Sequence, residues 1–258
     1  MLFDLPHILF MVGATVVISV LLVIFGIYIK SQKIKNLILL ISALLTIIIH
    51  FSTLYTTFFK TGVAKVEETM LLPIYPCNIA MWLLLISALL RNKQSKFFKI
   101  IAECTFYLGI VGGILGIVLN EIYASTPNLA DWGTLKGLLS HTTMLFGAIY
   151  LLVGKYIKVR VNNLISITIG LLYLVLNGWI IIGLYKLFKL SPPNSMYLLQ
   201  PPFEAAPWFN TYLIGAIAII LFFTITAIVE QIALKKEERW YYKIKLWYNE
   251  FKLRRKKQ

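Results

Sequence analysis

The chain has 258 residues, of which 59% are hydrophobic and only 14% are charged. Soluble globular proteins carry roughly 25% charged residues, so this composition excludes an ordinary water-soluble fold. The formal net charge of +14 raises the question of nucleic-acid binding. The positions of the basic residues favour a membrane-topology signal instead, and we predict no nucleic-acid partner.

The apolar residues form runs of about 20, the length that a helix needs to cross a hydrocarbon layer roughly 30 Å thick. The first run lacks a basic segment and a small-residue cleavage site, so we expect it to remain in the mature protein. We predict an all-α polytopic integral membrane protein with seven transmembrane helices. In chain order they are Ile8 to Ile29, Asn36 to Phe59, Pro76 to Leu90, Phe97 to Asn120, Thr134 to Val153, Leu164 to Tyr185 and Trp208 to Gln231.

Lysine and arginine residues are divided unequally between the predicted loops. Twenty of the 25 lie on the side that carries the C-terminal tail. Cytoplasmic loops are enriched in these residues, so the pattern predicts an N-terminus outside, a C-terminus in the cytoplasm and localisation in the cell membrane. The basic residues predicted on the outer side are Lys60, Lys65, Lys136, Lys186 and Lys189.

The chain divides into a predicted transmembrane domain, residues 1–233, and a basic, aromatic tail, residues 234–258. We expect the tail to form an interfacial amphipathic helix that binds anionic lipid headgroups. The outer loop Leu187 to Pro207 contains five prolines, which exclude a regular helix and predict a structured lid over the outer mouth. The loop Lys60 to Tyr75 is expected on the same face.

Ionisable groups are costly in hydrocarbon, so each one in a predicted span is a candidate functional residue. Helix rise places His50, Cys77, His141 and the neutral Asn177 in one layer, about 10 Å below the outer face. A structural hydrogen bond between helices is the alternative for each histidine. Glu103 lies nearer the inner face, and its role stays open.

Cys77 follows Pro76, a residue suited to the first position of a helix. A helix N-terminus favours the thiolate form and can hold a developing oxyanion. A nearby imidazole would act as the base, and an Asn or a carboxylate would orient it. The alternative is that Cys77, like Cys104, is a small buried hydrophobe. The two thiols differ in depth by roughly 10 Å, too far for a disulfide.

Four glycines in the fourth predicted span lie on a helix at i, i+4 spacing: Gly109, Gly112, Gly113 and Gly116. No strand precedes them and no lysine follows them, as a nucleotide-binding loop would require. Small residues at this spacing allow two helices to approach closely in a membrane. We therefore predict a helix-packing role.

Four stretches together resemble the YwaF-like family of bacterial integral membrane proteins, related to the eukaryotic transmembrane protein 164 family of cysteine-dependent phospholipid acyltransferases. They are Leu72 to Asn78, Tyr107 to Gly116, Gly137 to His141, and Asn194 to Leu198 followed by Pro201-Pro202.

The resemblance implies that Cys77 is the acyl-accepting nucleophile and that His141 is its catalytic partner. It includes Asn194 and Tyr197 in a family motif without giving them a role. This chain has Tyr75 where the family commonly has a histidine.

The leading hypothesis is a membrane transacylase that moves a fatty acyl chain from a phospholipid, through a Cys77 thioester, to a lyso-lipid or another membrane acceptor. His50, Asn78, Asn177, Asn194 and Tyr197 would support the site or bind substrate. The hypothesis needs no metal and no other cofactor. The alternatives are a small-molecule transporter, a lipid-binding membrane protein without catalysis, and a scaffold with no chemistry.

Overall fold

The structure is a computed structural model that describes residues 2–62, 71–161, 164–202 and 206–255. Parts of the predicted loops Lys60 to Tyr75 and Leu187 to Pro207, and the last residues of the tail, lie outside these ranges. Within them every regular element is helical. In chain order the elements are α1 (Leu5–Tyr28), α2 (Gln32–Thr61), α4 (Pro76–Leu89), α5 (Lys96–Val118), α6 (Glu121–Ser125), α7 (Trp132–Val153), α8 (Leu164–Leu187), η2 (Ser195–Tyr197), α9 (Thr211–Ala233), η3 (Lys236–Glu238) and α10 (Trp240–Arg255).

Polar caps fix several helix starts. α9 begins at Thr211, three residues later than the predicted Trp208, because the Asn210 side chain accepts hydrogen bonds from two N–H groups of the first turn. α1 begins at Leu5 rather than Ile8, because the Asp4 side chain accepts from the His7 N–H at 3.1 Å. The sequence analysis missed the short helix α6, which Asn120 caps in the same way.

Six helices in the described chain are long and apolar enough to cross a membrane: α1, α2, α5, α7, α8 and α9. The third predicted span differs from these. Its helix, α4, has 14 residues and is therefore about 21 Å long, shorter than a hydrocarbon layer of roughly 30 Å. Length and composition thus support a multi-pass membrane protein with six full-length spans and one short apolar helix.

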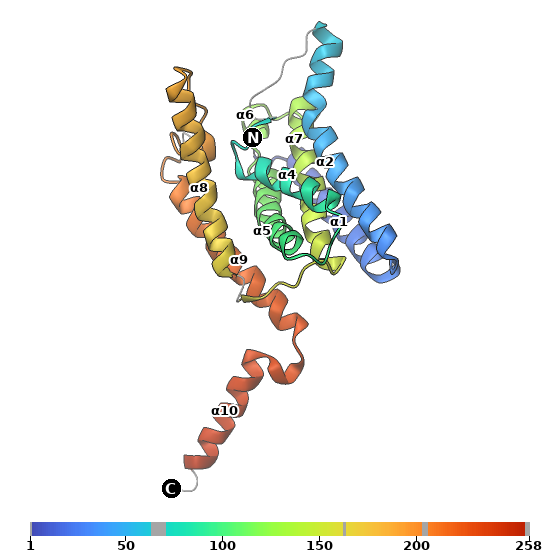
Figure 1. Ribbon diagram of the computed structural model, residues 1–258, viewed down its shortest axis with the longest axis vertical. Helices are drawn as coiled ribbons and strands as arrows, with labels where there is room; N and C mark the ends of the chain where they lie inside the picture. The colour runs from blue at the N-terminus through green and yellow to red at the C-terminus, as the bar shows by residue number, and fades with distance from the viewer. Residues whose placement is uncertain (1, 63–70, 162–163, 203–205, 256–258) are drawn as a thin grey trace.

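α5 and α7 form the centre of the bundle (Figure 1). α4 packs on α5, while α2 and α1 pack on α7. α8 and α9 lie beside this bundle, where the hydroxyls of Tyr107 and Thr226 form a hydrogen bond of 2.6 Å between α5 and α9. We call the end of the bundle that contains the first residues of α4, α7 and α9 the cavity end. The opposite end, which leads to the projecting helix α10, is the tail end.

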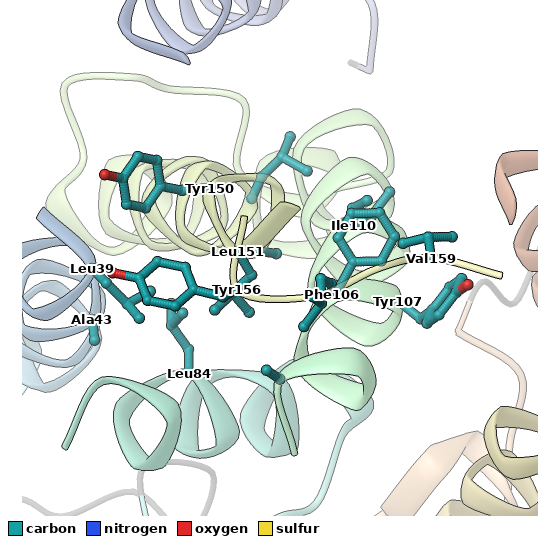
Figure 2. Close-up of a cluster of buried hydrophobic side chains, with 14 of the residues drawn as sticks. Leu39, Ala43, Leu84, Phe106, Tyr107, Ile110, Tyr150, Leu151, Tyr156 and Val159 are labelled. Atoms are coloured by element: carbon teal, nitrogen blue, oxygen red, sulfur yellow. The ribbon is translucent and has the colours of Figure 1, made fainter. Parts of the chain in front are cut away.

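Large side chains fill the middle and the tail end of the bundle, as Figure 2 shows. Phe106 on α5, Tyr150 on α7 and Tyr156 just after α7 are buried there. The Tyr150 ring stacks on Phe146 and meets Phe25 of α1 edge-on. This part of the molecule is therefore an ordinary close-packed core.

Candidate active site

The cavity end of the bundle contains a partly open cavity of about 680 Å³. Its walls come from α2, α4 and α7 on one side and α8 and α9 on the other, with α5 between them. Most of the lining is apolar. Five of the candidate site residues named from the sequence share this cavity: His50, Cys77, Asn78, His141 and Tyr197.

Cys77 lies in the first turn of α4, directly after an extended segment, Pro73 to Tyr75. Asn78 ties the two together, since its side-chain oxygen accepts from the Tyr75 N–H at 3.0 Å. The backbone N–H groups of Asn78 and Ile79 both donate to Tyr75 O, at 3.0 and 3.3 Å. Cys77 therefore lies at the N-terminus of α4, as the sequence predicts, where helix N–H groups lack intrahelical partners.

The carbonyl groups of the extended segment all accept hydrogen bonds. Pro73 O accepts from the Asn177 side chain at 3.0 Å. Ile74 O accepts from the Met196 N–H at 2.8 Å and from the Ser195 hydroxyl at 3.0 Å. Tyr75 O accepts from the first turn of α4. Irregular backbone is tolerated at membrane depth when the protein satisfies its polar groups in this way.

The motif Asn194 to Tyr197 packs against the segment Pro73 to Tyr75 and forms hydrogen bonds with it. Met196 and Tyr197 adopt left-handed backbone conformations, with φ of 53° and 55°, which cost about 1–3 kcal/mol each outside glycine. The Tyr197 ring stacks on Tyr75 with ring centroids 4.9 Å apart. Asn194 does not reach the cavity; its side-chain oxygen accepts from the N–H groups of Leu199 and Gln200 and shapes the turn.

Two glycines of α5 make room for the candidate catalytic pair. A Cβ added at Gly112 would lie 3.6 Å from the Cα and Cβ atoms of Cys77. A Cβ added at Gly116 would overlap the imidazole ring of His141. Gly112 and Gly116 are one turn apart, about 6 Å along the helix. Cys77 and His141 therefore approach the same face of α5 on successive turns.

The other two glycines of that helix have the packing role predicted from their spacing. A Cβ at Gly109 would lie 2.6 Å from the Cβ of Ala148, and one at Gly113 would lie 2.7 Å from the Cβ of Leu145. Both neighbours are on α7. The packing prediction is thus confirmed for Gly109 and Gly113, whereas Gly112 and Gly116 also shape the site.

His141 has a buried ring nitrogen, Nδ1, with no hydrogen-bond partner among the described residues. His50 on α2 lines the same cavity. The sequence analysis expected an Asn or a carboxylate to orient the imidazole. Asn177 is not that group, because its amide binds Pro73 O and it is not among the described cavity-lining residues. The ring lies against Gly116 of α5.

Lys136 is a cavity residue that the sequence analysis counted only as an outer basic residue. Its side chain is 8% exposed, and its Nζ donates to the Thr53 hydroxyl at 3.0 Å. The four-residue spacing from Lys136 to Ser140, another cavity residue, could have signalled that Lys136 faces the same cavity. Cys104 lies elsewhere, and both cysteines are free, as predicted.

Three apolar side chains form the floor of the cavity toward the tail end: Leu108, Leu171 and Phe222. The same three line a small pocket beneath, together with Cys104, Tyr107 and Gly170. Beyond that pocket the aromatic core begins. Among the described residues, the polar groups at this level are the Cys104 thiol and the Tyr107 hydroxyl, which forms a hydrogen bond with Thr226.

The apolar helices define a multi-pass helical membrane protein. Its cavity holds a candidate cysteine–histidine site, formed by a cysteine at a helix N-terminus and a buried histidine. The sequence model of the TMEM164 family matches residues 2–228, most of the chain. This chain belongs to the TMEM164 family. Searches of curated proteins and of solved structures return no match.

Proposed function

We propose that this protein is a membrane acyltransferase that moves a fatty acyl chain from a phospholipid to a lyso-lipid or another membrane acceptor. The observation that carries the proposal is the position of Cys77, at the N-terminus of the short helix α4 and in one cavity with His141. A cysteine at a helix N-terminus and a histidine that shares its cavity are the groups that acyl transfer through a thioester requires.

In the first step the Cys77 sulfur attacks the ester carbonyl of the donor, and His141 takes the thiol proton. The carbon–oxygen bond of the ester then breaks, and His141 returns the proton to the leaving lyso-lipid oxygen. In the second step an acceptor hydroxyl attacks the thioester, loses its proton to His141, and Cys77 leaves as the thiol. The Cys77 N–H would stabilise the oxyanion in both steps, because Pro76 has no N–H and those of Asn78 and Ile79 donate to Tyr75 O.

The shape of the cavity supports an acyl substrate over a transported solute. Its walls are mainly apolar, and Leu108, Leu171 and Phe222 close it toward the tail end. Buried Phe106, Tyr150 and their neighbours fill the space beyond. A transport path would need polar groups continuing through that region.

The membrane topology that we propose has seven crossings in the cell membrane, with the cavity end outside and the tail end in the cytoplasm. α4 and the extended segment Pro73 to Tyr75 together make the third crossing, which accounts for the short helix. The basic residues support this orientation. α10, with four aromatic residues exposed, would lie on anionic headgroups at the cytoplasmic surface.

An acyl-transfer assay tests the proposal. The purified protein in detergent is given a phosphatidylcholine with a labelled acyl chain and an unlabelled lysophospholipid acceptor. Wild type is expected to transfer the label, and Cys77→Ser to transfer none. Cys104→Ser is the matched control, because it changes the other free thiol and should keep the activity. Full activity in Cys77→Ser would overturn the proposal.

A further inference from the structure

The cavity has little depth below the reaction centre for a long acyl chain. Gly112 on α5 marks the level of Cys77, because a Cβ added there would lie 3.6 Å from the Cβ of Cys77. Leu108, part of the apolar floor, lies one helical turn nearer the tail end, about 6 Å away. An extended chain that advances about 1.2 Å per bond reaches that floor after roughly five bonds. The chains of one bilayer leaflet cover about 15 Å, half of the hydrocarbon layer, so they need another direction.

The wall of the cavity opens sideways beside α8 and α9. Leu172 on α8 and Ile219 on α9 line the cavity, yet they are 66% and 45% exposed. A residue that lines a cavity and is also exposed on the outside of the molecule lies at the edge of an opening. Ile219 follows Thr211, the first residue of α9, by eight residues, about 12 Å along the helix. At that distance from the end of a membrane-spanning helix, the opening faces the acyl chains of the bilayer.

Gly215 lies on α9 at the level of the reaction centre. α9 begins at the cavity end, where α5 ends, so the two helices run in opposite directions. The ring of Phe222 on α9 packs against Tyr107 on α5, with centroids 5.1 Å apart. Gly215 precedes Phe222 by seven residues and therefore lies about 10.5 Å nearer the cavity end. On α5 the reaction centre, marked by Gly112 and Gly116, lies about 7.5 to 13.5 Å from Tyr107 in the same direction.

The space in front of Gly215 is open. This residue lines the cavity, and a Cβ added to it would have no described heavy atom within 4 Å. Gly112 and Gly116 differ, because the same space at those positions is taken by Cys77 and His141. Ile219, at the edge of the opening, is four residues further along the same face of α9. A larger side chain at position 215 would therefore fit without displacing its neighbours and would project between the reaction centre and the opening.

We propose that the acyl chain on Cys77 leaves the cavity sideways, beside α9 and into the bilayer, and that Gly215 keeps this passage open. This inference rests on the proposed acyltransferase function and adds the path of the chain and a residue that determines which chain lengths react. The thioester carbonyl stays beside Cys77 and His141. The carbons that would not fit above the floor lie among Ile219 and the surrounding lipid, so the protein does not need to enclose the whole chain.

The first measurement is the initial rate of Cys77 acylation by dihexanoyl- and dioleoylphosphatidylcholine, followed by intact-protein mass. The variants are Gly215→Ala and Gly215→Leu. Gly215→Leu should slow the oleoyl donor at least about tenfold relative to wild type, because added carbons in a filled passage are costly. The hexanoyl donor should be slowed less than about twofold, because its chain ends near the floor. Gly215→Ala should fall between wild type and Gly215→Leu.

The matched control is Gly183→Leu. Gly183 on α8 also has no described atom within 4 Å of an added Cβ, but it is not among the described cavity-lining residues. This variant should keep both rates. The ratio of the two donors within one variant does not depend on how much folded protein the preparation contains. A Gly215→Leu variant that slows both donors by the same factor, or slows neither, would overturn the inference.

A chain that coils inside the cavity or displaces its floor is the competing path, and a photoreactive donor distinguishes it. Wild type in lipid nanodiscs is acylated with a long chain that carries a diazirine at its last carbon, and the sample is irradiated. The sideways path predicts crosslinks to bilayer lipid. Crosslinks confined to Leu108, Leu171 and Phe222 would contradict it. Absence of acylation by every donor would instead be the failure of the proposed function itself.

Discussion

The two halves of α7 each bury a polar atom that has no hydrogen-bond partner in the described chain: Nδ1 of His141 and the hydroxyl of Tyr150. Around Tyr150 the space is filled by Phe25, Phe146 and Tyr156. Around His141 the neighbouring helix presents Gly116, and a cavity opens. An unpartnered polar atom in a packed core is a cost of burial, whereas one beside a cavity is positioned to meet a ligand. The packing around the atom therefore distinguishes the two cases.

The largest effect that this comparison predicts is at His141. We expect His141→Gln to lower acyl transfer about 10²–10⁴-fold, because the imidazole moves a proton in both steps. The measurement is the initial rate of label transfer at saturating donor. The folded state is checked by thermal unfolding. A variant that folds normally and retains more than a tenth of the activity would remove His141 from the mechanism.

Gly116 is predicted to have the next largest effect. Gly116→Ala places a methyl group where the His141 ring lies, so the ring must move, and a misplacement of about 1 Å can cost 10²-fold in rate. The matched control is Gly13→Ala on α1, where an added Cβ has nothing within 4 Å. Equal activity in the two variants would show that the position of the ring does not limit the reaction.

Gly109 is predicted to affect stability more than activity, because it packs against α7. Gly109→Ala forces α5 and α7 apart at Ala148 and should lower the free energy of unfolding by about 1–3 kcal/mol. Because Gly109 does not line the cavity among the described residues, the rate per folded molecule should change much less than in Gly116→Ala. Thermal unfolding and the acyl-transfer rate, measured on the same samples, separate the two effects. A large rate loss with unchanged stability would contradict this division of roles.

The smallest effect is expected at Tyr150. Tyr150→Phe removes a hydroxyl that has no described partner and keeps the ring in the core, so stability should stay the same or rise slightly. Activity should stay within about twofold. A thermal unfolding curve is sufficient to check the prediction. A marked destabilisation would show that the hydroxyl has a stabilising partner.

Much of the fold could be predicted from apolar run lengths, because the lipid environment sets how long a crossing helix must be. Helix ends were less predictable, since single capping side chains such as Asn210 and Asp4 decide them. α4 was predicted at nearly its observed length, but the sequence alone did not show that the preceding segment is held by Asn177 and the Ser195–Met196 turn. Those contacts join residues more than 100 positions apart.

The candidate site, like the fold, depends on contacts between distant residues that the sequence alone does not give. Depth along each helix was sufficient to group His50, Cys77 and His141, which do share a cavity. Depth does not give the direction in which a side chain points, so Asn177 was placed with them although it binds a backbone carbonyl. For the same reason Lys136 was counted as a loop charge. The fit of Gly116 against His141 is a contact between two helices, and no local pattern encodes it.

The most direct test of the account is to look for the covalent intermediate within one molecule that contains both thiols. Wild-type protein is incubated with phospholipid, digested, and its acylated peptides are mapped with and without hydroxylamine. The account predicts a hydroxylamine-sensitive acyl group on Cys77 and none on Cys104. Acylation of Cys104 alone, or of neither thiol while acyl transfer proceeds, would contradict it.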